Sequence, residues 1–200
     1  MTSVFLIILA YLIGAIPSAY IFTVKIKGVD IREIGSGNVG ATNAARALGL
    51  KYGIIVALLD ILKGFLAVSL VYFLMGNNIN QSIVYLSGLA VIIGHDFSVF
   101  LKFNGGKGVA TSVGVILGLE PIILLFLVII WFLIAVITRY ISLASVLSAL
   151  ILPAVAYLIS AETIAILFFL VFGLLIVISH HENISRLIKG TENKFGRSDG

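Results

Sequence analysis

Residues 108–138 read GVATSVGVILGLEPIILLFLVIIWFLIAVIT, and this stretch decides the fold. It is apolar almost throughout, yet it is too long for one helix across about 30 Å of hydrocarbon, which takes about 20 residues. Glu120-Pro121 interrupts the run, and helices usually end before a proline. We therefore expect a short helix near 108–119 and a full membrane-spanning helix after the proline.

The rest of the chain has the same character. Its 200 residues are 60% hydrophobic and 11% charged, whereas soluble domains are about 45–50% apolar and about 25% charged. No polar stretch is long enough for a separate soluble domain. Together with the short helix, the apolar runs predict an all-α integral membrane protein, a bundle of about seven transmembrane helices in one polytopic domain over 1–200. The full-length runs lie at 3–24, 52–75, 81–101, 122–138, 141–159 and 162–180.

Seven crossings place nearly all basic residues on one face of the membrane. Because Lys and Arg gather in cytoplasmic loops, this face is expected to be cytoplasmic, with the N-terminus outside and the C-terminus inside. The residues assigned to it are Lys25, Lys27, Arg32, Arg46, Lys51, Lys102, Lys107, Arg139, Arg186, Lys189, Lys194 and Arg197.

Lys63 is the exception, because it lies in the middle of an apolar run together with Asp60. Residues three apart on a helix share a face, so the two side chains can pair, which lowers the cost of holding either in hydrocarbon. Two interpretations stay open at this point. The pair either locks helix packing or lines a polar cavity beneath the glycine-rich loops.

The most polar of these loops is GSGNVGATNAAR at 35–46. Small residues let backbone N–H groups crowd around an anion, hydroxyl and amide side chains add hydrogen bonds, and an arginine adds a planar phosphate donor. The stretch therefore predicts a phosphate or oxyanion cradle. Its candidate residues are Gly35, Ser36, Gly37, Asn38, Gly40, Thr42, Asn43 and Arg46.

A second candidate anion loop, Gly105-Gly106-Lys107-Gly108, directly precedes the expected short helix. A helix N-terminus supplies unpaired N–H groups and a partial positive charge, so this loop fits a phosphate as well. Two such loops suggest two phosphates. The alternative is a flexible turn whose Lys107 only anchors the loop at the lipid headgroups.

Two further polar elements lie at helix ends. His180 and Asn183 are three apart and would face the same way, so they can contact one substrate group, although a histidine beside the membrane is more often a headgroup contact. Ser142 follows Arg139 at another helix start. Since all four elements fall on the cytoplasmic face, the sequence predicts one active site there.

Familiar cofactor and metal motifs are not expected to operate. Residues 35–40 match G-x-G-x-x-G, but the strands of a dinucleotide fold are missing around them. Residues 104–108 lack the first glycine and the Ser/Thr of a phosphate-binding Walker loop. The three histidines have no metal-ligand spacing, and the chain has no cysteine. We therefore expect no metal, no cofactor and no nucleic-acid partner.

Four motifs resemble the bacterial acyl-phosphate:glycerol-3-phosphate acyltransferase family, PlsY, over essentially the whole chain. They are GSGNVGATNAAR at 35–46, GH-x-F-x-x-F-x-x-F-x-GGKGVAT at 94–111, RY-x-S-x-x-S at 139–145 and H-x-x-NI-x-RL-x-x-G-x-E at 180–192. The resemblance implies acyl transfer from acyl phosphate to the sn-1 hydroxyl of glycerol 3-phosphate at the bacterial inner membrane. The products would be lysophosphatidic acid and phosphate, in the first step of membrane phospholipid synthesis.

The resemblance also implies roles for the site residues. The glycine-rich backbones would hold the acyl phosphate group, and the soluble phosphate acyltransferase that makes acyl phosphate is a candidate protein partner. Because acyl phosphate carries a good leaving group, orientation and charge stabilisation suffice, and we expect the departing phosphate to take the hydroxyl proton in place of an obligatory base. Glycerol 3-phosphate would be held by Ser36, Arg46, Lys107, Ser142, His180 and Asn183.

The sequence departs from the family pattern at two places, and two other classes of protein compete with the acyltransferase interpretation. Ser98 stands where the family usually has proline, and His181 beside His180 leaves open which histidine contacts substrate. A transporter with a cytoplasmic anion gate is the main rival, but polar residues are scarce in the outer half of every span, and no inverted repeat is visible. A purely structural scaffold would not need glycine-plus-arginine clusters on one face.

Overall fold

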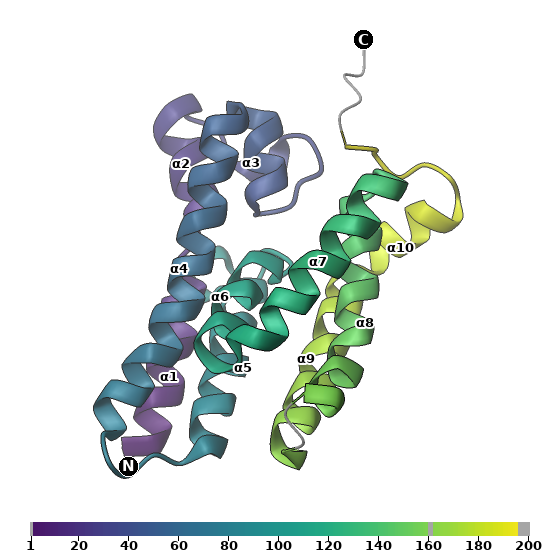
Figure 1. Cartoon of the computed structure of the whole chain (residues 1–200). Coiled ribbons are helices and arrows are strands. Elements are labelled where there is room, and N and C mark those ends of the chain that lie inside the picture. The colour runs from purple at the N-terminus through teal and green to yellow at the C-terminus, as the bar shows by residue number, and fades with distance from the viewer. Residues whose placement is uncertain (1, 160–161, 196–200) are drawn as a thin grey trace. The chain divides into compact units, whose positions relative to one another are not determined.

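The computed structural model describes residues 2–159 and 162–195, and within these residues all regular structure is helical (Figure 1). The prediction of an all-α fold is therefore confirmed. The elements are α1 (Thr2–Ala15), α2 (Ser18–Lys27), η1 (Ile31–Glu33), α3 (Ala41–Leu48), α4 (Leu50–Met75), α5 (Gln81–Asp96), η2 (Val99–Leu101), α6 (Val109–Leu119), α7 (Pro121–Thr138), α8 (Ile141–Ile159), α9 (Thr163–Ser179) and α10 (His181–Ile188), where η marks a 3-10 helix.

Single helices or consecutive pairs of them form apolar segments long enough to cross a membrane. Five segments of the described chain qualify outright, and α9 with α10 forms a sixth if the pair is one span bent by 60°. The short α6 has 11 residues and rises about 16 Å, about half of the hydrocarbon core. With α6 and α9, the described residues contain the seven apolar segments that the sequence predicts. The five segments that qualify outright are Ser3–Lys27, Leu50–Met75, Gln81–Leu101, Pro121–Thr138 and Ile141–Ile159.

The break between α6 and α7 falls where Glu120-Pro121 predicts it. Pro121 occupies the first position of α7, where its missing N–H costs nothing and its fixed φ suits a helix. The sequence did not predict a second break, in the span expected at 3–24. There α1 ends at Ala15 and α2 begins at Ser18, so Ile16 and Pro17 separate two helices.

The chain divides into two compact units, Met1–Leu119 and Glu120–Gly200, and each is described by itself. In the first unit α1 packs on α4 and α5, and α4 packs on α3 and α6. Glycines make the closest approaches: a Cβ on Gly64 of α4 would collide with the carbonyl of Thr111 in α6. Small residues at such crossings let helix backbones approach closely in the absence of a hydrophobic driving force.

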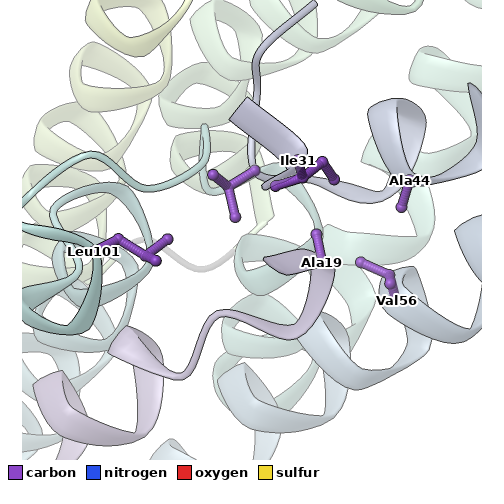
Figure 2. Packing of buried hydrophobic residues seen from close by; sticks show 6 residues of the cluster. Ala19, Ile31, Ala44, Val56 and Leu101 are labelled. Atoms are coloured by element: carbon purple, nitrogen blue, oxygen red, sulfur yellow. The ribbon is translucent and has the colours of Figure 1, made fainter. Parts of the chain in front are cut away.

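A compact cluster of buried apolar side chains supports the loops of this unit (Figure 2). It joins α2, η1, α3, α4 and η2, so the loop at 34–40 and the segment before α6 rest on one common core. The members are Ala19, Ile31, Val39, Ala44, Val56 and Leu101.

In the second unit, α8 packs against α7 and α9, and α10 lies against α8 and α9. Trp131 Nε1 of α7 donates to Ser145 Oγ of α8 over 3.1 Å. The stacked rings of Phe168 and Phe172 lie on α9. Arg197, which the sequence assigns to the cytoplasmic face, lies outside the described residues.

Candidate anion-binding site

The loop between η1 and α3 is folded around the side chain of Asn43, which is 1% exposed. Asn43 Nδ2 donates to the carbonyls of Ile34 over 2.9 Å, Asn38 over 3.0 Å and Ile31 over 3.2 Å. Its Oδ1 accepts the backbone N–H of Ser36 over 3.0 Å. The sequence predicts Asn43 as a group that touches the anion, whereas in the structure its polar atoms bind the loop backbone and give the cradle its shape.

Glycines allow the cradle this conformation. Gly35 and Gly37 have φ values of 59° and 70°, a region that side chains rarely occupy. A Cβ on Gly35 would in addition collide with Asn43 Oδ1. Gly40 caps α3 without a side-chain hydrogen bond, so the first N–H groups of that helix are available to an anion.

The charged and hydroxyl groups of the cradle lie on its outer side. Ser36, Thr42 and Arg46 are exposed, and Asn38 is half-buried. Arg46 Cδ lies 3.9 Å from the position that a Cβ on Gly35 would take, so the guanidinium stem begins beside the glycine turn. This is the arrangement in which an arginine can grip an anion that the loop backbone holds.

Arg32 joins the cradle region to the second glycine-rich segment. Its Nη2 lies 2.6 Å from Asp30 Oδ2, and its Nη1 donates to the carbonyl of Leu101 in η2 over 3.3 Å. The hydrogen bond from Arg32 holds the pKa of Asp30 below its usual value. The sequence assigned Arg32 only to the basic face, because a contact this distant along the chain leaves no local pattern.

The second glycine-rich loop folds back onto the end of α5. Gly105 N–H donates to Asp96 O, and Gly106 N–H donates to His95 O, both over 3.0 Å. A Cβ on Gly106 would collide with His95 Nε2 and would lie 2.6 Å from Val39 O in the cradle. The two predicted anion loops therefore lie side by side, with Gly106 against Val39.

Twelve predicted site residues thus belong to the first unit, in two glycine-rich segments that touch, and three of them lie in α3. Lys107 is half-buried, and Gly108 has a φ of 71° next to Asp96. The other three, Ser142, His180 and Asn183, belong to the second unit. The twelve are Gly35, Ser36, Gly37, Asn38, Gly40, Thr42, Asn43, Arg46, Gly105, Gly106, Lys107 and Gly108.

In the second unit two of the predicted residues, Ser142 and Asn183, bind Glu192. Its Oε1 accepts from Ser142 Oγ and from Asn183 Nδ2, each over 2.7 Å, and its Oε2 accepts from Arg186 Nε over 2.7 Å. Burial alone raises the pKa of Glu192, but the hydrogen bonds from Asn183, Ser142 and Arg186 outweigh it and hold that pKa below the ordinary value. Glu192 is not among the predicted site residues, although it is the last residue of the motif at 180–192.

The structure also separates the two neighbouring histidines. His180 is buried at the 60° bend between α9 and α10, and its Nδ1 lies 2.8 Å from Ile176 O. Because a carbonyl only accepts, Nδ1 carries the proton. His181 is exposed, with its Nδ1 3.0 Å from Ile178 O.

The pair predicted within the apolar part of α4 is present. Lys63 Nζ lies 2.8 Å from Asp60 Oδ1, and both side chains are buried. Ser18 Oγ donates to the same carboxylate oxygen over 3.1 Å. The predicted pairing is confirmed.

The apolar, membrane-length helices define an integral membrane protein, and the two touching glycine-rich segments are of a kind suited to an anion. Residues 4–190 match the family model described as Glycerol-3-phosphate acyltransferase, so the chain belongs to the glycerol-3-phosphate acyltransferase family, of the PlsY type. The predicted family membership is confirmed.

Named relatives resemble the chain over nearly its full length. A glycerol-3-phosphate acyltransferase of Aquifex aeolicus is 43% identical over 98% of this chain and 100% of its own. One of Fusobacterium nucleatum is 43% identical over 94% of this chain and 96% of its own.

Two solved structures have the same fold. The crystal structure of PlsY in its glycerol 3-phosphate form is 41% identical, with a TM-score of 0.90 over 98% of this chain and 96% of that chain. The lysophosphatidic acid form is 40% identical, with a TM-score of 0.88 and the same coverage. Both are described as an integral membrane glycerol 3-phosphate acyltransferase.

Proposed function

We propose that this acyltransferase moves a fatty acyl group from acyl phosphate to the sn-1 hydroxyl of glycerol 3-phosphate, without coenzyme A or any cofactor. The observation that carries the proposal is the contact of the two glycine-rich loops at Val39 and Gly106. Two touching anion loops suit a reaction in which donor and acceptor each bear a phosphate. The glycerol 3-phosphate and lysophosphatidic acid forms of the similar structures support this choice of acceptor and product.

The first unit supplies most of the anion contacts. We assign the exposed Ser36 and Arg46, with Lys107, to the phosphate of glycerol 3-phosphate. The acyl phosphate group and the developing oxyanion are assigned to Asn38, Thr42 and the first backbone N–H groups of α3, which no side chain caps. The N–H groups of Gly105 and Gly106 bind α5 carbonyls, so these two glycines contribute by shaping the second loop. Asn43 keeps the cradle in shape.

The second unit supplies Ser142, His180 and Asn183, which we assign to the glycerol part of the acceptor. Glu192 accepts a hydrogen bond from Ser142 and another from Asn183, and these two bonds fix the orientation of both side chains. We choose His180 over His181 because His180 is buried and its Nδ1 is anchored on the Ile176 carbonyl. We propose that residues 1–200 act as one polytopic membrane domain, because a relative matches 98% of the chain.

The chemistry needs no separate base. The sn-1 oxygen attacks the acyl carbonyl carbon, the bond from that carbon to the phosphate oxygen breaks, and the proton of the hydroxyl passes to the departing phosphate. The new ester bond gives lysophosphatidic acid, and inorganic phosphate leaves. Positioning the two substrates and stabilising their charge supply the rate acceleration.

We further propose a location in the bacterial inner membrane, with the N-terminus outside and the C-terminus and loops cytoplasmic. The distribution of basic residues supports this orientation. The soluble enzyme that produces acyl phosphate is then the natural protein partner, because it would deliver an amphiphilic substrate to the cytoplasmic face.

One experiment tests the proposed reaction against its rivals. Purified protein in detergent receives acyl phosphate and labelled glycerol 3-phosphate, with acyl-CoA in place of acyl phosphate as the control. We expect labelled lysophosphatidic acid with acyl phosphate only. Product from acyl-CoA alone would overturn the donor assignment, and phosphate counterflow in liposomes without any product would favour a transporter.

A further inference from the structure

Three ionisable side chains form a buried cluster inside the first unit: Asp60, Lys63 and His95. Lys63 Nζ lies 2.8 Å from Asp60 Oδ1, 2.8 Å from His95 Nδ1 and 3.0 Å from Ile16 O. The side chains of Asp60, Lys63 and His95 are 2%, 7% and 8% exposed. All three donors of the ammonium group are therefore used: one within α4, one on α5 and one on the break between α1 and α2.

One end of the buried cluster fastens the break between α1 and α2. Pro17 has no backbone N–H, so it cannot continue the hydrogen bonding of a helix at this break. The carbonyl of Ile16, just beyond the end of α1, accepts a hydrogen bond from Lys63. Ser18, the first residue of α2, donates to Asp60 over 3.1 Å. Both sides of the break are thus tied to α4.

The other end of the cluster reaches the second anion loop. Because an ammonium group only donates, His95 Nδ1 must accept from Lys63, and the imidazole proton is then on Nε2. That Nε2 lies directly against Gly106, while the His95 carbonyl accepts the Gly106 N–H over 3.0 Å. The His95 backbone therefore holds Gly106, and the His95 ring packs against it.

We propose that Asp60, Lys63 and His95 form a positioning cluster, which sets the Gly105-Gly106-Lys107 backbone against Val39 of the cradle. The inference rests on the proposed role of these loops in holding the substrate phosphates. A pair needed only for helix packing could be replaced by apolar side chains, which is often neutral or stabilising. Here Lys63 of α4 also binds α5 and the break between α1 and α2. The end of α5 in turn binds the loop that contains Gly105 and Gly106.

The decisive variant replaces the ion pair by apolar residues of similar size, Asp60→Leu with Lys63→Met, so that no unpaired charge is left. Thr23→Val is the matched control, because it removes a buried hydrogen bond, to Ala19 O over 2.9 Å, within α2 of the same unit. For each full-length protein in detergent we would measure Tm, the kinetic constants for glycerol 3-phosphate and hydrogen exchange of the peptide that contains Gly105 and Gly106.

In the double variant we expect a lower Tm, because Ile16 O, Ser18 Oγ and His95 Nδ1 lose their partners in the cluster. At a temperature where the variant is still folded, we expect a kcat/KM for glycerol 3-phosphate lower by about 10-fold or more and faster exchange at the loop peptide. The control should match the wild type in all three. Wild-type kinetics and loop exchange in the double variant would overturn the proposal and leave the pair a packing element.

Variants of His95 decide the matter if the double variant does not fold. The amide oxygen of His95→Asn stands near the Nδ1 position and still accepts from Lys63, whereas His95→Leu fills similar space without an acceptor. We expect His95→Asn to retain about 10-fold more kcat/KM than His95→Leu at matched Tm. Equal activities would contradict a positioning role.

The outcomes for the cluster and for the reaction are separable. If wild-type protein forms no product from acyl phosphate, the donor assignment fails. The exchange measurement still shows whether the cluster holds the loop.

Discussion

Ser142 and Asn183 donate hydrogen bonds to the same oxygen of Glu192, each over 2.7 Å. Ser142 lies in the first turn of α8 and Asn183 lies in α10, so the carboxylate joins two helices of the second unit. Arg186 occupies the other oxygen over 2.7 Å. Glu192, which we do not assign to substrate, thus orients two residues that we do assign to it.

Glu192→Gln tests this arrangement. Glutamine keeps one acceptor oxygen, but it presents an NH₂ group to Arg186, so one charge-assisted hydrogen bond, worth about 1.5–3 kcal/mol, is lost. We expect a Tm lower by about 5–10 °C and reduced acyl transfer. Thermal unfolding in detergent provides the measurement, and Glu162→Gln, at an exposed acid of the same unit, is the control. An unchanged Tm and activity would show that Glu192 is dispensable.

The stabilisation by Glu192 depends on pH in a defined direction. Its pKa in the folded protein is lowered from 4.5, because the hydrogen bonds from its three partners outweigh burial. A depressed carboxyl pKa stabilises the fold above the unfolded value, and this stabilisation is lost as the pH falls through the folded value. The Tm difference between wild type and Glu192→Gln should be full near about pH 7 and shrink below about pH 4.5. A difference that stays constant across this range would contradict the assignment.

Gly106→Ala tests the contact between the two anion loops. The added Cβ would collide with His95 Nε2 and with Val39 O, so the loops must move apart. We expect kcat/KM for glycerol 3-phosphate to fall by about 10-fold or more. The comparison is Gly118→Ala in α6, whose Cβ would meet only side-chain atoms of Val68 and Phe65, at 3.1 Å or more. Equal kinetics for the two variants would rule out a functional contact.

Local patterns explain which parts of the fold were predictable. The break at Pro121 and the Asp60–Lys63 pair follow from short-range rules, namely the missing proline N–H and the shared face of residues three apart. The break at Pro17 is another proline effect, but apolar residues on both sides conceal it within one span. The carbonyl of Ile16 there is bound by Lys63, a partner far along the chain.

In the candidate site too, some features follow from local sequence and others depend on contacts between distant residues. Glycine-rich composition reveals Gly35 and Gly106 as loop residues, because only small residues allow such turns and approaches. Composition does not show what a polar side chain will bind. Asn43 binds the loop backbone from inside, and Glu192 supports Asn183, through contacts that the tertiary structure determines.

Arg46 gives the sharpest test of the phosphate assignment. Lysine keeps the positive charge but loses the rigid fork that grips two phosphate oxygens, so Arg46→Lys should bind glycerol 3-phosphate less well while the fold stays intact. The loss of one charge-assisted bond, about 1.5–3 kcal/mol, corresponds to a drop in kcat/KM of about 10-fold to 150-fold. Arg46→Ala should be nearly inactive.

The alternative is that the exposed Arg46 only anchors the loop to anionic lipid headgroups. In that role a charge is worth about 1 kcal/mol, and lysine serves equally well. Steady-state kinetics of Arg46→Lys, with Tm measured alongside, separate the two roles. Lys25→Arg on α2 is the companion variant, because it exchanges the same two side chains at an exposed position outside both glycine loops. If Arg46→Lys at matched Tm has the kcat/KM of the wild type, Arg46 does not clamp the phosphate.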